Sequence, residues 1–326
     1  MSKRQIYNYS IINTFDFQSN DLCPLKVVII MFIIFSPYSF LFFRTYVLFM
    51  FSLFNITNFY YYWSVIELII LLFIGLSYTL FVRRYSQLMV YFLIQTLSSF
   101  ILLVFYIYNM PSLLTMAFLI KLSMFPFFIW YINLIYKFPN FIFWLASTLH
   151  KLPPILIIKL FSLELDLNIL WLSITLTTLF RGLIILTVID LRMLLVLSSI
   201  GNNSWFLLSQ IVNIFIFISF VLIYSFSLFL LLNSFKGISK PSLSSSLSAN
   251  PYRLRLWVLS ISGMPPFPVF FGKILVILSM LITMGINYFF ILFLVINSLI
   301  VIGYLQSVIK YFIYVYSSNI HYMLKY

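Results

Sequence analysis

The chain has 326 residues, of which 63% are hydrophobic and only 8% charged, and its mean hydropathy is +1.12. A soluble domain carries about 25% charged residues, so this chain cannot build a water-facing surface from its own side chains, and a soluble fold is excluded. The formal net charge is +13. Because the basic residues lie between apolar segments, they indicate orientation in a membrane rather than binding of nucleic acid.

Residues 1–26 are predicted to form a polar N-terminal extension. They contain Asp16 and Asp21 and have no apolar core, so no cleavable secretory or transit segment is expected there. Cys23, the one cysteine of the chain, also lies in this stretch. A single cysteine excludes an internal disulfide and any cysteine-based metal cluster.

The rest of the chain consists largely of apolar segments of roughly the 17–25 residues that one helical crossing requires. Such segments suit helices rather than barrel strands, so the predicted fold class is all-α, a polytopic membrane protein of about ten transmembrane helices. The predicted spans are 32–54, 59–82, 86–108, 112–134, 139–160, 168–189, 193–210, 212–233, a broken span over 255–283, and 288–315. Pro37 and Arg44 leave open whether the first apolar stretch is one helix or two. A polar loop over 233–255 and a C-terminal tail over 316–326 complete the chain.

The distribution of basic residues supports this count of helices. When the connections are assigned alternately to the two membrane faces, nearly all basic residues outside the spans fall on one face, as the positive-inside rule expects. That face receives Lys3, Arg4, Lys26, Arg83, Arg84, Lys137, Arg192, Lys236, Lys240, Arg253, Arg255 and Lys325. Both termini are then predicted to lie on the positive face.

Four charged residues are predicted to lie at membrane depth: Glu67, Lys121, Lys151 and Lys273. On insertion scales each charge costs about 3 kcal/mol at the centre of a span, so the four together cost on the order of 10 kcal/mol. Such a cost indicates that the side chains face a hydrated interior and interact with one another. Because burial disfavours the charged form of a lysine, such residues can exchange protons.

Each of the three lysines has proline nearby in the sequence. These prolines are Pro126, Pro153, Pro154, Pro265, Pro266 and Pro268. Proline breaks a helix, and a broken helix at membrane depth is tolerated where its free backbone groups line a wet cavity or pack on protein. We therefore expect interrupted helices that admit water beside the lysines.

Other interpretations of these charges remain open. Any single lysine can extend to the membrane surface or form a structural ion pair. Arg44 and Arg181 are expected to do one or the other. His150, next to Lys151, is either a relay partner or only a polar neighbour. His150 and His321 are far apart in the sequence and no glycine-rich phosphate loop is present, so neither metal nor cofactor is expected in this chain.

Several segments carry a family resemblance, namely "WSVIELIILLFI", "LIKLSMFPFFIW", "WLASTLHKLPPI", "DLRMLLVLSSIGNNSWFLL" and "SISGMPPFPVFFGK". In order and spacing they resemble the antiporter-like membrane subunits of respiratory complex I, and among these the chain 2 group of NADH-ubiquinone oxidoreductase. The resemblance extends from about Asn55 to Lys310. Relative to the family pattern, Phe128 and Asn202 replace histidines, and Val90 and Met193 stand where lysines are common.

The resemblance implies two inverted five-helix repeats with discontinuous helices, here over 27–162 and 163–315. It also implies a proton relay through Glu67, Lys121, Lys151 and Lys273, with His150 as a further candidate. Flavin, iron–sulfur clusters and quinone would lie in partner subunits. The expected partners are other subunits of the complex, especially neighbouring antiporter-like and small membrane subunits, together with the lipid bilayer; no nucleic acid is expected. The expected location is the mitochondrial inner membrane, with both termini on the matrix side. A stand-alone cation/proton antiporter and a structural spacer subunit are the alternative functions.

Overall fold

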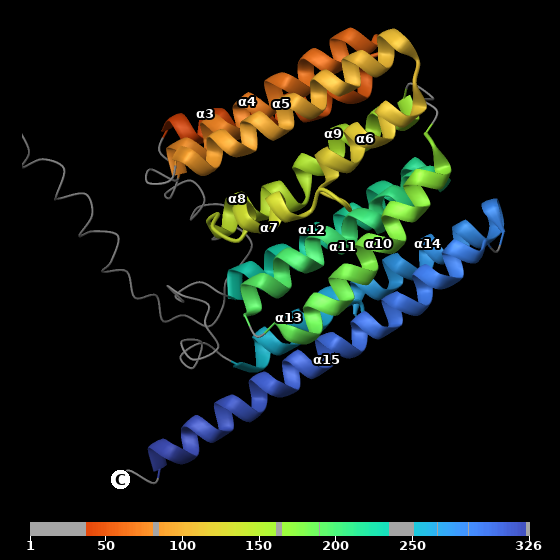
Figure 1. Cartoon of the computed structure of the whole chain (residues 1–326). Helices are drawn as coiled ribbons and strands as arrows, with labels where there is room; N and C mark the ends of the chain where they lie inside the picture. The colour runs from red at the N-terminus through yellow and green to blue at the C-terminus, as the bar shows by residue number, and fades with distance from the viewer. Residues whose placement is uncertain are drawn as a thin grey trace, which may run out of the picture.

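The computed structural model describes residues 37–80, 85–160, 165–188, 190–234, 251–265, 267–285 and 287–323. In these ranges every regular element is a helix, as predicted, and Figure 1 shows most of the helices as roughly parallel rods. The predicted N-terminal extension, most of the 233–255 loop and the last three residues of the tail lie outside these ranges, as does the predicted repeat boundary at 162/163.

The order of the helices follows the predicted spans. The elements are α3 (Pro37–Ser52), η1 (Leu53–Asn55), α4 (Phe59–Leu80), α5 (Tyr85–Tyr108), α6 (Pro111–Leu122), α7 (Ile129–Ile135), α8 (Asn140–Ser147), η2 (Leu149–Lys151), α9 (Leu152–Leu160), α10 (Leu167–Thr187), α11 (Leu191–Val212), α12 (Ile214–Ser234), α13 (Pro251–Ser262), α14 (Pro268–Met284) and α15 (Tyr288–Met323). α15 extends past the predicted end at residue 315 because no glycine or proline follows Gly303. Its 36 residues correspond to about 54 Å, well beyond the roughly 30 Å of a hydrocarbon core.

In the described part of the chain, six helical segments are long and apolar enough to cross a membrane. They are Phe59–Leu80, Ser86–Tyr108, Asn140–Ile158, Leu167–Thr187, Ile214–Asn233 and Tyr288–Gln306. α11 is also of spanning length but is not among them, because its middle carries a run of serine, glycine and asparagine over residues 198–204. These polar residues are buried inside the protein, where they need not face lipid.

α11 is the central helix of the molecule. It packs against α7 and α9 on the side of the first half of the chain, and against α10, α12 and α14 on the side of the second half. Figure 1 shows it in the middle of the stack, with α3, α4 and α5 at one edge and α15 at the other. A polar helix in this position is in contact with both halves of the structure at membrane depth.

Two predicted spans are interrupted by turns of the same geometry. Ser123 follows α6 with φ 54°, and Gly263 follows α13 with φ 78°, so each helix ends on a left-handed residue. Their amides donate to the carbonyls of the residues three positions earlier, at 3.1 and 3.4 Å. In each turn a phenylalanine amide, of Phe127 or Phe267, then donates to a methionine carbonyl, at 2.6 and 2.9 Å. The bonded residues of the second turn are all numbered 140 higher than those of the first (263 − 123 = 140; 267 − 127 = 140).

A third interruption separates α8 from α9. α8 ends at Ser147, and the short η2 turn carries His150 and Lys151 before α9 begins at Leu152. Pro153 therefore lies in the first turn of α9, where the missing N–H of proline costs nothing. The prolines here start the second helix segment, whereas the break itself occurs before them.

Candidate functional site

The three lysines predicted at membrane depth are buried in the structure. Lys121 and Lys151 are 3% exposed and Lys273 is 9% exposed, while Glu67 is partly buried. They come from four elements, α4, α6, η2 and α14, and none of the lysines faces lipid. Arg44, on α3, is exposed.

Lys151 is held by the interruption after α6. Its ammonium donates to the backbone carbonyl of Leu122 and to the Ser123 hydroxyl, both at 3.2 Å. Leu122 is the last residue of α6, so its carbonyl has no partner within the helix, and the helix dipole favours a cation there. The Lys151 Nζ atom also lies 4.2 Å from the centre of the Tyr131 ring, a cation–π contact.

Lys121 lies one residue before the end of α6. Its ammonium donates to the carbonyl of Gln95 on α5 at 3.5 Å and interacts electrostatically with Glu67 on α4. The Oε1 atom of Glu67 is buried and has no hydrogen-bond partner among the described residues. Glu67 therefore acts on Lys121 through its field, while the hydrogen bond of Lys121 goes to the backbone.

His150, which precedes Lys151 in η2, is surrounded by aromatic side chains. Its Nδ1 atom lies 3.3 Å from the Tyr46 hydroxyl, and its ring packs against Phe73 at 4.7 Å and Tyr91 at 5.8 Å between centroids. Both Lys121 and Lys151 interact with it electrostatically. Glu67, Lys121, His150 and Lys151 thus form one group of interacting side chains, which we call the first cluster.

α11 connects to the first cluster through one of its faces. Ser199 donates to the Tyr131 hydroxyl at 3.2 Å, and the Asn203 amide donates to the Leu122 carbonyl at 2.5 Å. Residues 199 and 203 are one turn apart and share a face of the helix. The Leu122 carbonyl therefore accepts from both Lys151 and Asn203.

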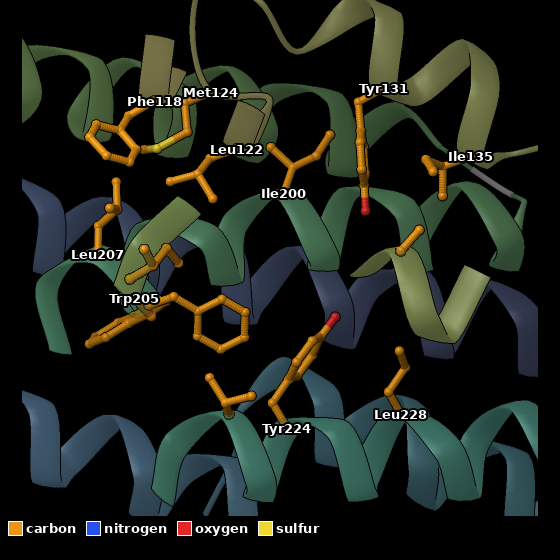
Figure 2. Packing of buried hydrophobic residues seen from close by; sticks show 14 of the residues in the cluster. Phe118, Leu122, Met124, Tyr131, Ile135, Ile200, Trp205, Leu207, Tyr224 and Leu228 are labelled. Carbon is orange, nitrogen blue, oxygen red and sulfur yellow. The ribbon is translucent and has the colours of Figure 1, made fainter. Parts of the chain in front are cut away.

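Tyr131 also approaches the second half of the chain. Figure 2 shows the hydroxyl ends of Tyr131 and Tyr224, which lies on α12, directed toward each other from opposite sides of the buried region. The two tyrosines interact electrostatically. Hydroxyl and amide groups thus occupy the space between the first cluster and the second half of the protein.

Lys273 belongs to a separate group on the other side of α11. Its ammonium donates to the carbonyl of Ser262, the last residue of α13, at 2.9 Å, and lies 5.7 Å from the centre of the Trp205 ring. A Cβ atom on Gly263 would lie 2.5 Å from Lys273 Nζ, so the glycine both adopts the positive φ of the turn and leaves room for the ammonium. The interrupted helices therefore supply a terminal carbonyl to Lys151 and another to Lys273.

Arg181, on α10, is a buried cation on the same side of α11 as Lys273. It does not extend to the membrane surface, as one of its two predicted roles required, because it is only 3% exposed and donates to the Tyr304 hydroxyl at 3.3 Å. It interacts electrostatically with Lys273. We call Arg181, Lys273 and Tyr304 the second cluster. The neighbouring threonines of "SITLTTLFRG" were the signal for a buried polar face of this helix.

The residues that depart from the family pattern lie in different environments, and Val90, for example, is exposed. Phe128 packs against Phe180 with centroids 6.1 Å apart, so this position is apolar. Asn202 is buried, and its side chain lies against the hydroxyl of Tyr224 on α12. Within those ranges, no three His, Cys, Asp or Glu side chains gather in a way that could hold a metal ion.

Comparison with known proteins gives a consistent result. Residues 105–301 match the family model described as NADH:quinone oxidoreductase/Mrp antiporter, transmembrane region. The chain is 32% identical over 236 residues to NADH-ubiquinone oxidoreductase chain 2 of Albinaria caerulea, covering 68% of this chain and 72% of that protein. The chain 2 proteins of Aedes aegypti and Gallus gallus are 29% and 33% identical over 54% and 51% of this chain. The chain spans about half the length of these last two relatives, 51% and 49%.

Two solved structures have the same fold. A chain of respiratory complex I from Thermus thermophilus with bound aureothin superposes with a TM-score of 0.62 at 19% identity, over 76% of this chain and 64% of that chain. A chain of the membrane-bound sulfane sulfur reductase, an archaeal respiratory membrane complex, gives a TM-score of 0.59 at 16% identity, over 76% and 60%. The chain therefore shares its overall fold with these two chains.

Proposed function

The chain belongs to the NADH:quinone oxidoreductase/Mrp antiporter family of membrane proteins, in the group of NADH-ubiquinone oxidoreductase chain 2, and on this basis we propose that it is a proton-translocating subunit in the membrane arm of NADH:ubiquinone oxidoreductase. In this proposal the partners are other subunits of that complex. Flavin, iron–sulfur clusters and quinone reside in those partners, and no redox chemistry takes place in this chain. The membrane is the mitochondrial inner membrane, in keeping with the animal relatives.

The proposed membrane topology is ten crossings arranged as two inverted five-helix repeats, 27–162 and 163–315. The equivalent turns after α6 and α13, offset by 140 residues, support a repeat (263 − 123 = 140). Both termini would lie on the positive, matrix face. In support of this orientation, Arg192 at the start of α11 donates to the Tyr136 carbonyl at 2.6 Å and to Asn140 at 2.9 Å, beside Lys137, so these basic residues share one end of the bundle.

The proposed relay begins at the first cluster. Glu67 favours the charged form of Lys121 through its field, so a change at Glu67 would bind or release a proton at Lys121. His150 and Lys151 lie next in line. The Tyr131 hydroxyl, Ser199 and Asn203 then offer donors and acceptors across α11. Lys273 would exchange the proton with one side of the membrane.

This proposal depends on one observation, the burial of three lysines. Two of them, Lys151 and Lys273, each donate a hydrogen bond to the terminal carbonyl of an interrupted helix. A structural spacer would not need amines at membrane depth, because an intramembrane ionisable residue is costly to insert. Lys121→Met removes the amine but keeps an unbranched, apolar side chain of similar length.

The test is NADH-driven proton translocation by the assembled complex in sealed vesicles. We expect Lys121→Met to abolish or sharply reduce the protons moved per NADH while assembly is retained. Lys137→Met is the matched control, because Lys137 is exposed in the turn between α7 and α8. Wild-type proton translocation by an assembled Lys121→Met complex would contradict the relay.

A further inference from the structure

Arg181 is a buried charge without a counter-ion in the described structure. Only its Nη2 atom has a hydrogen-bond partner there, the Tyr304 hydroxyl at 3.3 Å, and its buried Nε and Nη1 atoms have none. A buried charge is costly to desolvate, by several kcal/mol, unless it is paired. The proposed relay assigns Arg181 no part, and the inference below rests on that proposed function.

The protein makes room for this guanidinium at one position. A Cβ atom on Gly201 of α11 would collide with the Nη1 and Cζ atoms of Arg181, so only glycine allows the side chain to lie there. On the other side, the ring of Tyr304 faces the guanidinium, with 5.8 Å from Cζ to its centroid. Arg181 is therefore fixed between α11 and α15.

This fixed charge lies next to Lys273. Gly201 and Trp205 are one turn apart on the same face of α11. Arg181 lies against Gly201. The Lys273 ammonium lies 5.7 Å from the centre of the Trp205 ring. Residues 199 and 203, which contact the first cluster, point the opposite way. The two cations thus occupy adjacent positions on one side of the central helix.

Negative charge is distant from the two cations in the described part of the second half. The acids there are Asp166 and Asp190, which lie immediately before α10 and α11. Asp190 precedes Gly201 by 11 residues (201 − 190), about 16 Å along the helix. The titratable groups beside Arg181 are Tyr224 on α12, which interacts with it electrostatically, and Tyr304 on α15, whose hydroxyl accepts its hydrogen bond.

We propose that Arg181 is a positioning residue whose permanent positive charge drives release of the proton from Lys273. Arginine does not give up its proton in proteins, whereas a buried lysine does. Two buried like charges repel each other, so the pair relaxes when Lys273 becomes neutral. In each cycle, the charge of Arg181 then returns Lys273 to its deprotonated form.

The informative variant is Arg181→Met, assayed in the assembled complex. Replacing a buried charge by an apolar side chain of similar length is tolerated or stabilising, and the Tyr304 hydroxyl keeps its bond to the Leu194 carbonyl at 3.5 Å. Protons moved per NADH are measured from pH 6 to pH 9. Without the neighbouring cation Lys273 holds its proton more tightly, so the pH for half-maximal translocation rises by about 1 unit and alkaline pH restores the activity.

Three further variants make the result decisive. Arg181→Lys replaces the permanent charge by a buried amine that can lose its proton, so its pH profile should shift in the same direction as that of Arg181→Met, by a smaller amount. Arg44→Met removes an exposed cation from α3 and should change nothing. Lys273→Met should abolish translocation at every pH, which separates failure of this inference from failure of the relay. An Arg181→Met complex with the wild-type profile, or one that does not assemble, would show that Arg181 is structural and overturn the inference. Normal translocation by Lys273→Met would overturn the relay itself.

Discussion

The Lys151 ammonium donates a hydrogen bond to the carbonyl of Leu122 at 3.2 Å, and this contact joins η2 to the free end of α6. The carbonyl is available only because the helix stops there. The Asn203 amide of α11 donates to the same oxygen at 2.5 Å. One backbone atom at an interrupted helix thus connects a lysine of the first cluster to the central helix.

Removal of the Lys151 amine should stop proton transfer in the proposed relay. In Lys151→Met the Leu122 carbonyl keeps its bond to Asn203, so the variant should fold and assemble. We expect protons moved per NADH to fall by about 10²-fold or more, as when a proton-transfer group is deleted. Lys137→Met is again the control, and an assembled Lys151→Met complex with normal stoichiometry would count against this role.

The Tyr131 ring and hydroxyl have separable roles. The ring lies 4.2 Å from Lys151 Nζ, whereas the hydroxyl accepts from Ser199 at 3.2 Å. Tyr131→Phe keeps the cation–π contact and removes only the hydroxyl. Ser199 remains satisfied, because its single hydroxyl hydrogen can go to the Val196 carbonyl, 2.7 Å away. We expect slower translocation with unchanged stability, measured by initial proton-uptake rate and thermal unfolding. Equal rates in Tyr131→Phe and the wild type would remove the hydroxyl from the path.

Glu67 should act through its charge. Glu67→Gln keeps the shape of the side chain and removes the field on Lys121, so we expect reduced proton translocation with normal assembly. Asp166→Asn is the matched control, because it makes the same carboxylate-to-amide change outside the first cluster. Asp166 caps α10 by accepting a hydrogen bond from the Ile169 amide at 3.4 Å. The control should lose no translocation, because asparagine caps a helix as well as aspartate does. Similar translocation in both variants would argue against a role for the Glu67 charge.

One prediction concerns stability alone. The buried hydroxyl of Tyr62 on α4 donates to the Pro153 carbonyl at 2.9 Å and so ties α4 to α9. Tyr62→Phe should lower the unfolding free energy by about 1 kcal/mol, the usual net value of such a bond. Tyr61→Phe is the control, since Tyr61 is 68% exposed. Thermal unfolding of the purified complex should shift for the first variant and not for the second.

The sequence by itself determined the class of the protein and the segments in which its helices are interrupted. The composition required a membrane protein. The length of the apolar segments then required helices, because in lipid every backbone N–H and C=O group must be hydrogen-bonded within the protein, and segments of this length achieve that as helices. The insertion cost of Lys121, Lys151 and Lys273 marked them as interior residues, and the structure places all three inside. Proline marked the neighbourhood of each interruption because its backbone preference is local, although each helix ends before the prolines, at Leu122, Ser147 and Ser262.

Only the tertiary structure decided which groups meet. Leu122 and Ser262 carry no sequence signal as lysine partners, since what they contribute is a backbone carbonyl freed by chain geometry. Arg44 and Arg181 both stand within apolar sequence, yet one is exposed and the other lies against Gly201. The difference depends on which helix packs on which face, and that follows from contacts between residues far apart in the chain, which local patterns do not encode.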